Sequence, residues 1–118
     1  MILIAFRSML TPEAKAEGNE YEKLTDVMFA RASSWPGFVA MKSYTGEDGE
    51  RLTLVWWKDA ETLRSWREDA PHDSAQRKGR ELWYEWYEMD VAEIVRESRF
   101  SRSGPRERFG PAALTGAS

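Results

Sequence analysis

The sequence has no cysteine and only one histidine, and these shortages exclude several kinds of chemistry. Without cysteine the chain can form no disulfide, no thiolate metal site and no cysteine nucleophile. A zinc ion held by a single histidine would need three oxygen ligands, which is not the usual ligand set of a protein zinc site. We therefore expect no metal ion in the functional site.

An excess of positive charge and a long hydrophobic run are also missing. The net charge is −3, and no basic stripe offsets it, so a nucleic-acid partner is not expected. The apolar run at the start has six residues and no basic residue before it, which is too short for a signal peptide or a membrane span. We expect a cytoplasmic protein with no membrane partner.

Tryptophan, in contrast, is abundant, with six residues in a chain of 118. Each indole is a large apolar plate that carries one N–H donor, so such a supply suits the wall of a pocket or an interface. A tryptophan-rich core explains the same count, and both interpretations remain open at this point. The length fits one domain.

Apolar runs bounded by turn residues predict four strands, at residues 2–9, 38–45, 51–57 and 82–100, the last one long and bent near its middle. The second and third strands are predicted to form a hairpin, in which Asp48 and Gly49 supply positive φ angles.

Helices are predicted between the strands. Thr11 caps the first helix, with Pro12 at its first position and a restart near Gly18 and Asn19. Its apolar stripe is formed by Tyr21, Leu24, Val27, Met28 and Ala32. Asp59 caps a second helix whose inward residues are Leu63 and Trp66. A short third helix runs from Pro71 to about Gly79, with His72, Ala75, Gln76 and Gly79 on its inner side.

The resulting order, β-α-β-β-α-α-β, predicts a ferredoxin-like α+β fold with helices on one face of an antiparallel sheet. Helices can cover only one face, yet the first and third strands are apolar at both parities. A second copy of the same sheet would hide the other face, so we expect a homodimer.

The sequence resembles the antibiotic biosynthesis monooxygenase (ABM) superfamily, whose members are dimeric α+β barrels. The resemblance covers residues 2–100 and includes residues 35–38 (Trp-Pro-Gly-Phe) and Trp57-Lys58. Further matches are Trp66, Pro71-His72 and the run from Tyr84 to Phe100 that ends in residues 96–100. The resemblance implies an ABM-like domain at residues 1–100. Residues 101–118, rich in Gly, Pro, Ser and Arg, are expected to form a tail or an arm over a neighbouring subunit.

The activity that the resemblance implies is cofactor-independent monooxygenation of an aromatic or polyketide-like small molecule. Oxygen accepts electrons one at a time, so such a substrate must first become an electron-rich anion, which requires a base and an apolar aromatic slot. His72 has a suitable intrinsic pKa for the base, and Trp66 matches the family's pocket tryptophan. Phe6, rather than Arg7, is expected to face the pocket. The predicted pocket residues are Phe6, Ser8, Trp57 and Gln76, and no cofactor is expected.

Three alternatives remain. His72 and Trp66 can be structural residues of the helix and the core, and the protein can be a non-catalytic binding protein for a hydrophobic metabolite. The third alternative is haem binding or haem degradation, as in other members of the family. Those members use an axial histidine where Gln76 stands here, together with an asparagine that the first strand lacks. His72, one helical turn earlier, is the substitute ligand in that hypothesis.

Overall fold

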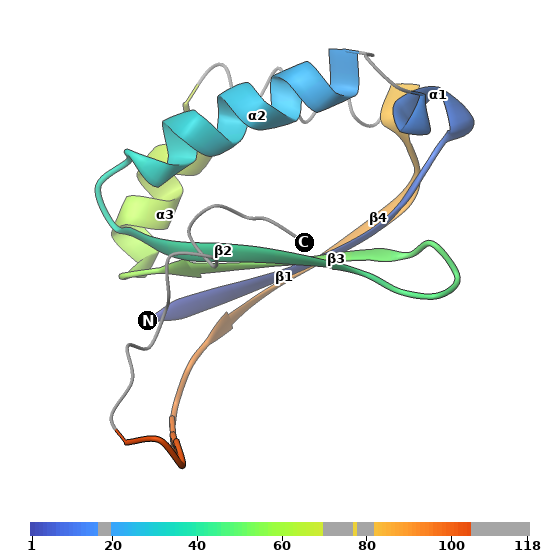
Figure 1. Cartoon of the computed structure of the whole chain (residues 1–118). Coiled ribbons are helices and arrows are strands. Elements are labelled where there is room, and N and C mark those ends of the chain that lie inside the picture. The colour runs from blue at the N-terminus through green and yellow to red at the C-terminus, as the bar shows by residue number, and fades with distance from the viewer. Residues whose placement is uncertain (17–19, 70–76, 78–81, 105–118) are drawn as a thin grey trace.

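The computed structural model describes residues 1–16, 20–69, 77 and 82–104, and this part forms one antiparallel sheet with helices on one face (Figure 1). The four strands have the order β2-β3-β1-β4. The elements are β1 (Ile2–Leu10), α1 (Pro12–Lys15), α2 (Glu20–Ser33), β2 (Phe38–Thr45), β3 (Arg51–Trp57), α3 (Ala60–Arg67) and β4 (Tyr84–Glu93). The predicted ferredoxin-like α+β class is confirmed.

The predicted strands at 38–45 and 51–57 are confirmed with their bounds, and β1 gains one residue at Leu10. In the hairpin between β2 and β3, the amide of Gly49 donates to the carbonyl of Gly46 at 3.0 Å. Only Gly49 has a positive φ, of 89°, so the prediction that Asp48 shares this conformation is wrong. A single residue without a side chain is enough to reverse the chain here.

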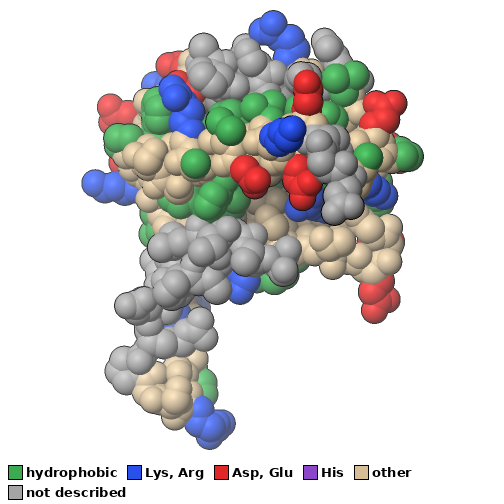
Figure 2. Space-filling view, turned by 45° about the horizontal axis from the view of Figure 1, so that its top comes forward, with side chains coloured by type: hydrophobic (Ala, Val, Ile, Leu, Met, Phe, Trp, Pro, Cys, Tyr) green, Lys and Arg blue, Asp and Glu red, His purple; other side chains and the backbone are tan. Residues whose placement is uncertain are grey.

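The last strand is shorter than predicted, because β4 ends at Glu93 instead of Phe100. Glu93 pairs with Ile2, and the amide of Ile94 donates to the carbonyl of Met1 at 2.9 Å, so β1 has no further residue to offer. The irregularity in β4 also lies at its start rather than its middle, since Glu85 has no partner between the pairs Leu10–Tyr84 and Met9–Trp86. Residues 94–104 then leave the sheet on the side opposite the helices (Figure 1), and in Figure 2 the end of the described chain projects from the main body. Val95 in this segment is 93% exposed.

Both predicted helix caps are confirmed. The hydroxyl of Thr11 accepts from the amide of Ala14 at 3.3 Å, and the carboxylate of Asp59 accepts from the amide of Thr62 at 2.8 Å. The predicted helix restart at residues 18–19 and the third helix at residues 71–79, apart from Arg77, lie outside the described residues.

The predicted inner stripe of α2 is wrong at Val27, which is 59% exposed. Leu24, Met28 and Ala32 follow one another at intervals of four and lie on one side of the helix. Val27 lies about 100° around the helix axis from Met28, which turns it away from that side. Phe29 is an additional inner apolar residue, and its ring packs edge-on against that of Phe38, with the ring centroids 6.4 Å apart.

The sheet face opposite the helices is apolar along its two central strands. Leu3 and Ala5 of β1 pair with Trp56 and Leu54 of β3, and all four are only half-buried. The predicted apolar character of both faces is thereby confirmed for these strands. Arg7, on the same face, forms ion pairs with Glu50 at 2.8 Å and with Glu88 at 3.3 Å.

We expect replacement of Gly37 by alanine to lower the free energy of unfolding by about 3 kcal/mol. Gly37 has a φ of 93°, and a Cβ at this position would overlap the side chain of Thr62 on α3. Gly49→Ala is the matched control, because Gly49 has a similar φ but its added Cβ would meet only the sulfur of Met9, at 3.8 Å. The control should lose about 1 kcal/mol. Equal losses in urea unfolding would contradict the overlap.

Candidate functional site

A cavity of about 280 Å³ lies between the helix-side face of the sheet and the helices α2 and α3. Its lining residues come from every strand and from both helices. They are Ile4, Phe6, Ser8, Tyr21, Leu24, Thr25, Met28, Phe29, Ala32, Phe38, Met41, Ser43, Arg51, Thr53, Val55, Trp57, Leu63, Trp66, Arg67, Trp83, Tyr84, Tyr87, Met89 and Val91. The volume is near the lower end of the range for small-molecule sites.

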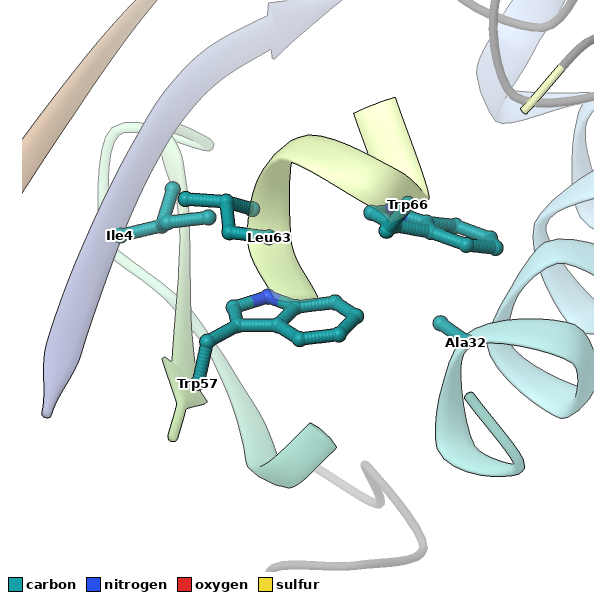
Figure 3. Close-up of a cluster of buried hydrophobic side chains, with 5 residues drawn as sticks. All are labelled: Ile4, Ala32, Trp57, Leu63 and Trp66. Atoms are coloured by element: carbon teal, nitrogen blue, oxygen red, sulfur yellow. The ribbon is translucent and has the colours of Figure 1, made fainter. Parts of the chain in front are cut away.

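One end of the cavity is formed by aromatic plates. The indoles of Trp57, from β3, and Trp66, from α3, lie nearly parallel, with ring centroids 6.2 Å apart and planes inclined by 27°. Figure 3 shows Leu63, Ile4 and Ala32 around them. Trp57 is 1% exposed and Trp66 is 6% exposed, so both plates also belong to the core. A flat apolar group at this end of the cavity would lie against side chains that are tightly packed in the core.

The opposite end of the cavity floor is polar, and strand register places its residues in one row. Arg51 of β3 pairs with Ser8 of β1, which pairs with Tyr87 of β4. The next row still mixes polar and apolar residues, since Thr53 pairs with Phe6, and the hydroxyl of Thr53 lies 3.0 Å from that of Ser43. The floor therefore changes from polar at the hairpin end to apolar at the Trp57 end.

Two further tyrosines line the cavity and contact each other, and one of them, Tyr84, is close enough to Arg51 to interact with it electrostatically. Tyr21 of α2 and Tyr84 of β4 both line the cavity, with ring centroids 6.1 Å apart, and their hydroxyls interact. Burial raises the pKa of Tyr84 well above its usual value, and the interaction with Tyr21 adds to this effect. The hydroxyl of Tyr84 therefore keeps its proton at neutral and moderately alkaline pH and serves as a hydrogen-bond donor.

The cavity has no acidic residue among the described residues that line it, although the chain as a whole is acidic. Arg51 and Arg67 are the two charged residues of the lining as far as the structure describes it, and both are positive. No histidine occurs in this described lining either, so none of the described lining residues has a group that ordinarily titrates near neutral pH. The described residues also contain no cluster of three side chains suited to hold a metal ion.

The structure brings four of the predicted site residues to this cavity: Phe6, Ser8, Trp57 and Trp66. Ser8 is 2% exposed and lies in the polar row. Arg7 points to the other face of the sheet. His72 and Gln76 lie outside the described residues, so their predicted places in the pocket stay predictions.

Sequence reasoning missed Arg51, Tyr84 and Tyr87. The position of Arg51 could have been predicted from the sequence. The hairpin turn at Gly49 fixes where β3 begins, and Arg51 lies an even number of residues from Trp57, so both side chains point to the same face of the sheet. Tyr84 and Tyr87 carried no such signal. They stand on β4 across a bulge, and only the pairing of β4 with β1, more than 70 residues away along the chain, decides which way they face.

No helix within the described residues is long and apolar enough to cross a membrane. The sheet order and the one-sided helices define a ferredoxin-like α+β fold, and a partly open aromatic cavity lies between its sheet and its helices.

Solved structures identify the particular variety of this fold. A crystal structure of an antibiotic biosynthesis monooxygenase matches with a TM-score of 0.67 at 12% identity, over 81% of this chain and 100% of that one. SnoaB, a cofactor-independent oxygenase from Streptomyces nogalater, matches with a TM-score of 0.66 at 15% identity, over 81% and 94%. Rv0793 from Mycobacterium tuberculosis matches with a TM-score of 0.70 at 18% identity, over 83% and 98%. The chain has the ABM superfamily fold.

Among curated proteins, the chain is 28% identical to the uncharacterized protein YqjZ of Bacillus subtilis (strain 168) over 99 residues. The match covers 83% of this chain and 87% of YqjZ. No protein-family model matches the sequence.

Proposed function

We propose that the protein is a cofactor-independent monooxygenase that acts on an aromatic or polyketide-like small molecule. The observation that carries this proposal is the cavity itself, which is lined by stacked indoles and by no acidic side chain among its described residues, in a chain with the ABM fold. Similarity in fold to SnoaB adds to it, since that protein is a cofactor-independent oxygenase. Fold alone does not define a reaction, so the chemistry must be tested directly.

The reaction balances without any external reductant. A base removes a proton from an activated ring CH₂ group, and the resulting enolate passes its electrons to O₂ in single steps. One oxygen atom becomes a ring carbonyl, and the other leaves as water with the two hydrogens of the CH₂ group. The carbon loses four electrons and O₂ gains four. In this proposal His72 is the base, and Trp66 is a wall of the slot whose indole N–H lies near the reacting oxygen.

Oxygen consumption with anthrone-type phenols tests the proposal. We expect enzyme-dependent uptake of one O₂ for each quinone formed, with no stimulation by nicotinamide, flavin or metal ions. The same solution without protein measures the spontaneous oxidation of the substrate. If no member of a panel of such phenols gives uptake above this background, the oxygenase proposal is wrong.

Non-catalytic binding of a hydrophobic metabolite is the second candidate, and one observation favours it: the described lining contains no group that titrates near neutral pH. A binding protein would show ligand-dependent quenching of tryptophan fluorescence without oxygen uptake. Haem binding, the third candidate, requires His72 as the iron ligand, because Gln76 stands where related haem-degrading proteins have their axial histidine. Haem titration would then give a Soret band that His72→Ala abolishes.

We further infer that two chains pack through the apolar sheet face as a homodimer. One row across this face runs from Lys42 on β2 through Leu54 and Ala5 to Asp90 on β4. Twofold packing of two such sheets can place Lys42 opposite Asp90 of the partner subunit, so the apolar centre is flanked by complementary charges.

Replacement of Leu54 by lysine should convert this dimer to a monomer at micromolar concentration. Leu54 lies at the centre of the apolar face, where a buried and unpaired charge is strongly unfavourable. Val27→Lys is the control, because Val27 lies on the exposed side of α2. Thr25 on the same helix is less suitable because it lines the cavity. Native mass spectrometry should find the wild type and Val27→Lys dimeric. A monomeric wild type would refute the dimer.

A further inference from the structure

The polar row at the hairpin end of the cavity contains a cation, Arg51, that forms no ion pair with an acidic residue in the described part of the chain. No ion pair or hydrogen bond joins the Arg51 side chain to another described side chain, although the residue is half-buried. Arg7 and Arg31 contrast with it, because each meets a carboxylate oxygen at 2.8 Å. Arg51 interacts electrostatically with the phenol of Tyr84.

The neighbours of Arg51 are hydrogen-bonding groups. Ser8 stands directly beside it on β1, where paired side chains have Cβ atoms about 5 Å apart. Tyr87 follows on β4, and Tyr84 and Tyr21 also line the cavity. A guanidinium and several hydroxyls thus converge where the described lining contains no carboxylate. Such a set matches an anionic oxygen group, because arginine binds carboxylates through paired N–H donors.

The distance along the floor separates this polar end from the tryptophan end. Arg51 and Trp57 are the first and last residues of β3, and the six residue-to-residue steps between them span about 20 Å between their Cα atoms. Both side chains line the cavity, so a ligand that meets both must be elongated. Its charged group would then be remote from the ring that lies against Trp57 and Trp66.

We propose that the ligand of this cavity is an elongated aromatic carboxylate, whose carboxylate binds to Arg51 beside Ser8 and the tyrosine hydroxyls while its rings lie against Trp57 and Trp66. The inference deepens the proposed function and rests on it only in taking this cavity as the substrate site. The carboxylate is a recognition group and takes no part in the oxygen chemistry.

Tryptophan quenching by anthracene-2-carboxylate and by the neutral anthracene-2-carboxamide tests this inference without any turnover. We expect the wild type to bind the carboxylate about 10- to 100-fold more tightly than the amide, the range that hydrogen bonds to a charged group provide. Arg51→Met should remove this preference and leave the affinity for the amide unchanged. Arg51→Lys, which keeps the charge but loses the paired donors, should retain part of it.

Two control variants separate Arg51 from other cations. Arg64→Met, on the exposed side of α3, should leave both affinities at their wild-type values. Arg67→Met tests the other cation of the lining. A loss of preference in Arg67→Met but not in Arg51→Met would overturn the inference. Equal affinity of the wild type for both compounds, or no binding of either, would overturn it as well.

The failure of this inference is distinguishable from failure of the proposed function. Carboxylate-selective binding with no oxygen uptake would refute the oxygenase and keep the assignment of Arg51. Oxygen uptake that favours neutral phenols over their carboxylated analogues, unchanged in Arg51→Met, would keep the oxygenase and refute the assignment.

Discussion

His72→Ala is expected to lower kcat/KM for oxygen consumption by about 10²- to 10⁴-fold, the usual contribution of a general base. Proton removal must precede electron transfer to O₂, and the cavity lining described in the structure has no group that ordinarily titrates near neutral pH. His72 is the single histidine of the chain and is the base in our proposal. The wild-type rate should therefore rise with pH through the histidine range, because only neutral imidazole accepts a proton.

Gln76→Ala is the matched control for this prediction, since Gln76 belongs to the same predicted helix and pocket but cannot serve as a base. Its kcat/KM should change less than 10-fold, well below the smallest effect expected for His72. Added imidazole should partly restore the His72 variant. A His72 variant with wild-type turnover and an unchanged pH profile would remove this residue from the mechanism.

Trp57→Ala should lower the free energy of unfolding by about 3–5 kcal/mol, as large-to-small changes of buried tryptophan do. Trp57 is 1% exposed and packs against Phe38 at 5.7 Å and Trp66 at 6.2 Å between ring centroids. Its removal would leave a void at the junction of β3, α2 and α3 (Figure 3). Such a loss is a large share of the stability of an ordinary domain, which is about 5–15 kcal/mol.

Val27→Ala provides the comparison, because Val27 is apolar but lies on the exposed side of α2. Its effect in urea unfolding should stay within about 0.5 kcal/mol of zero. A Trp57 variant that unfolds at the wild-type denaturant concentration would show that this indole is not part of the core.

The strands β2 and β3 could be predicted with their bounds because each is a local pattern. Their apolar residues, the turn between them and the glycine with positive φ all fall within 20 residues of sequence. The end of β4 could not be predicted in this way. Its residues after Glu93 remain favourable for a strand, but a strand ends where its neighbour does, and β1 begins at Ile2.

The candidate site likewise contains residues that could be predicted from the sequence and residues that could not. Trp57, Trp66 and Phe6 were predicted at the pocket in the light of the family resemblance, and the structure places them around one cavity. The polar row of Arg51, Ser8 and Tyr87 was not predicted as a unit. It depends on two registers, β3 with β1 and β1 with β4, that join segments far apart in the chain.

The sequence by itself determined the fold class, the helix caps, the hairpin and the two apolar faces of the central strands. These features arise from contacts within a few residues or from simple parity. The tertiary structure alone decided that the cavity floor changes from cationic and polar to aromatic, and that Arg51 meets hydroxyls there instead of acids. A shift of one residue in either register would turn these side chains to the opposite face, and no local pattern in the sequence prevents that shift.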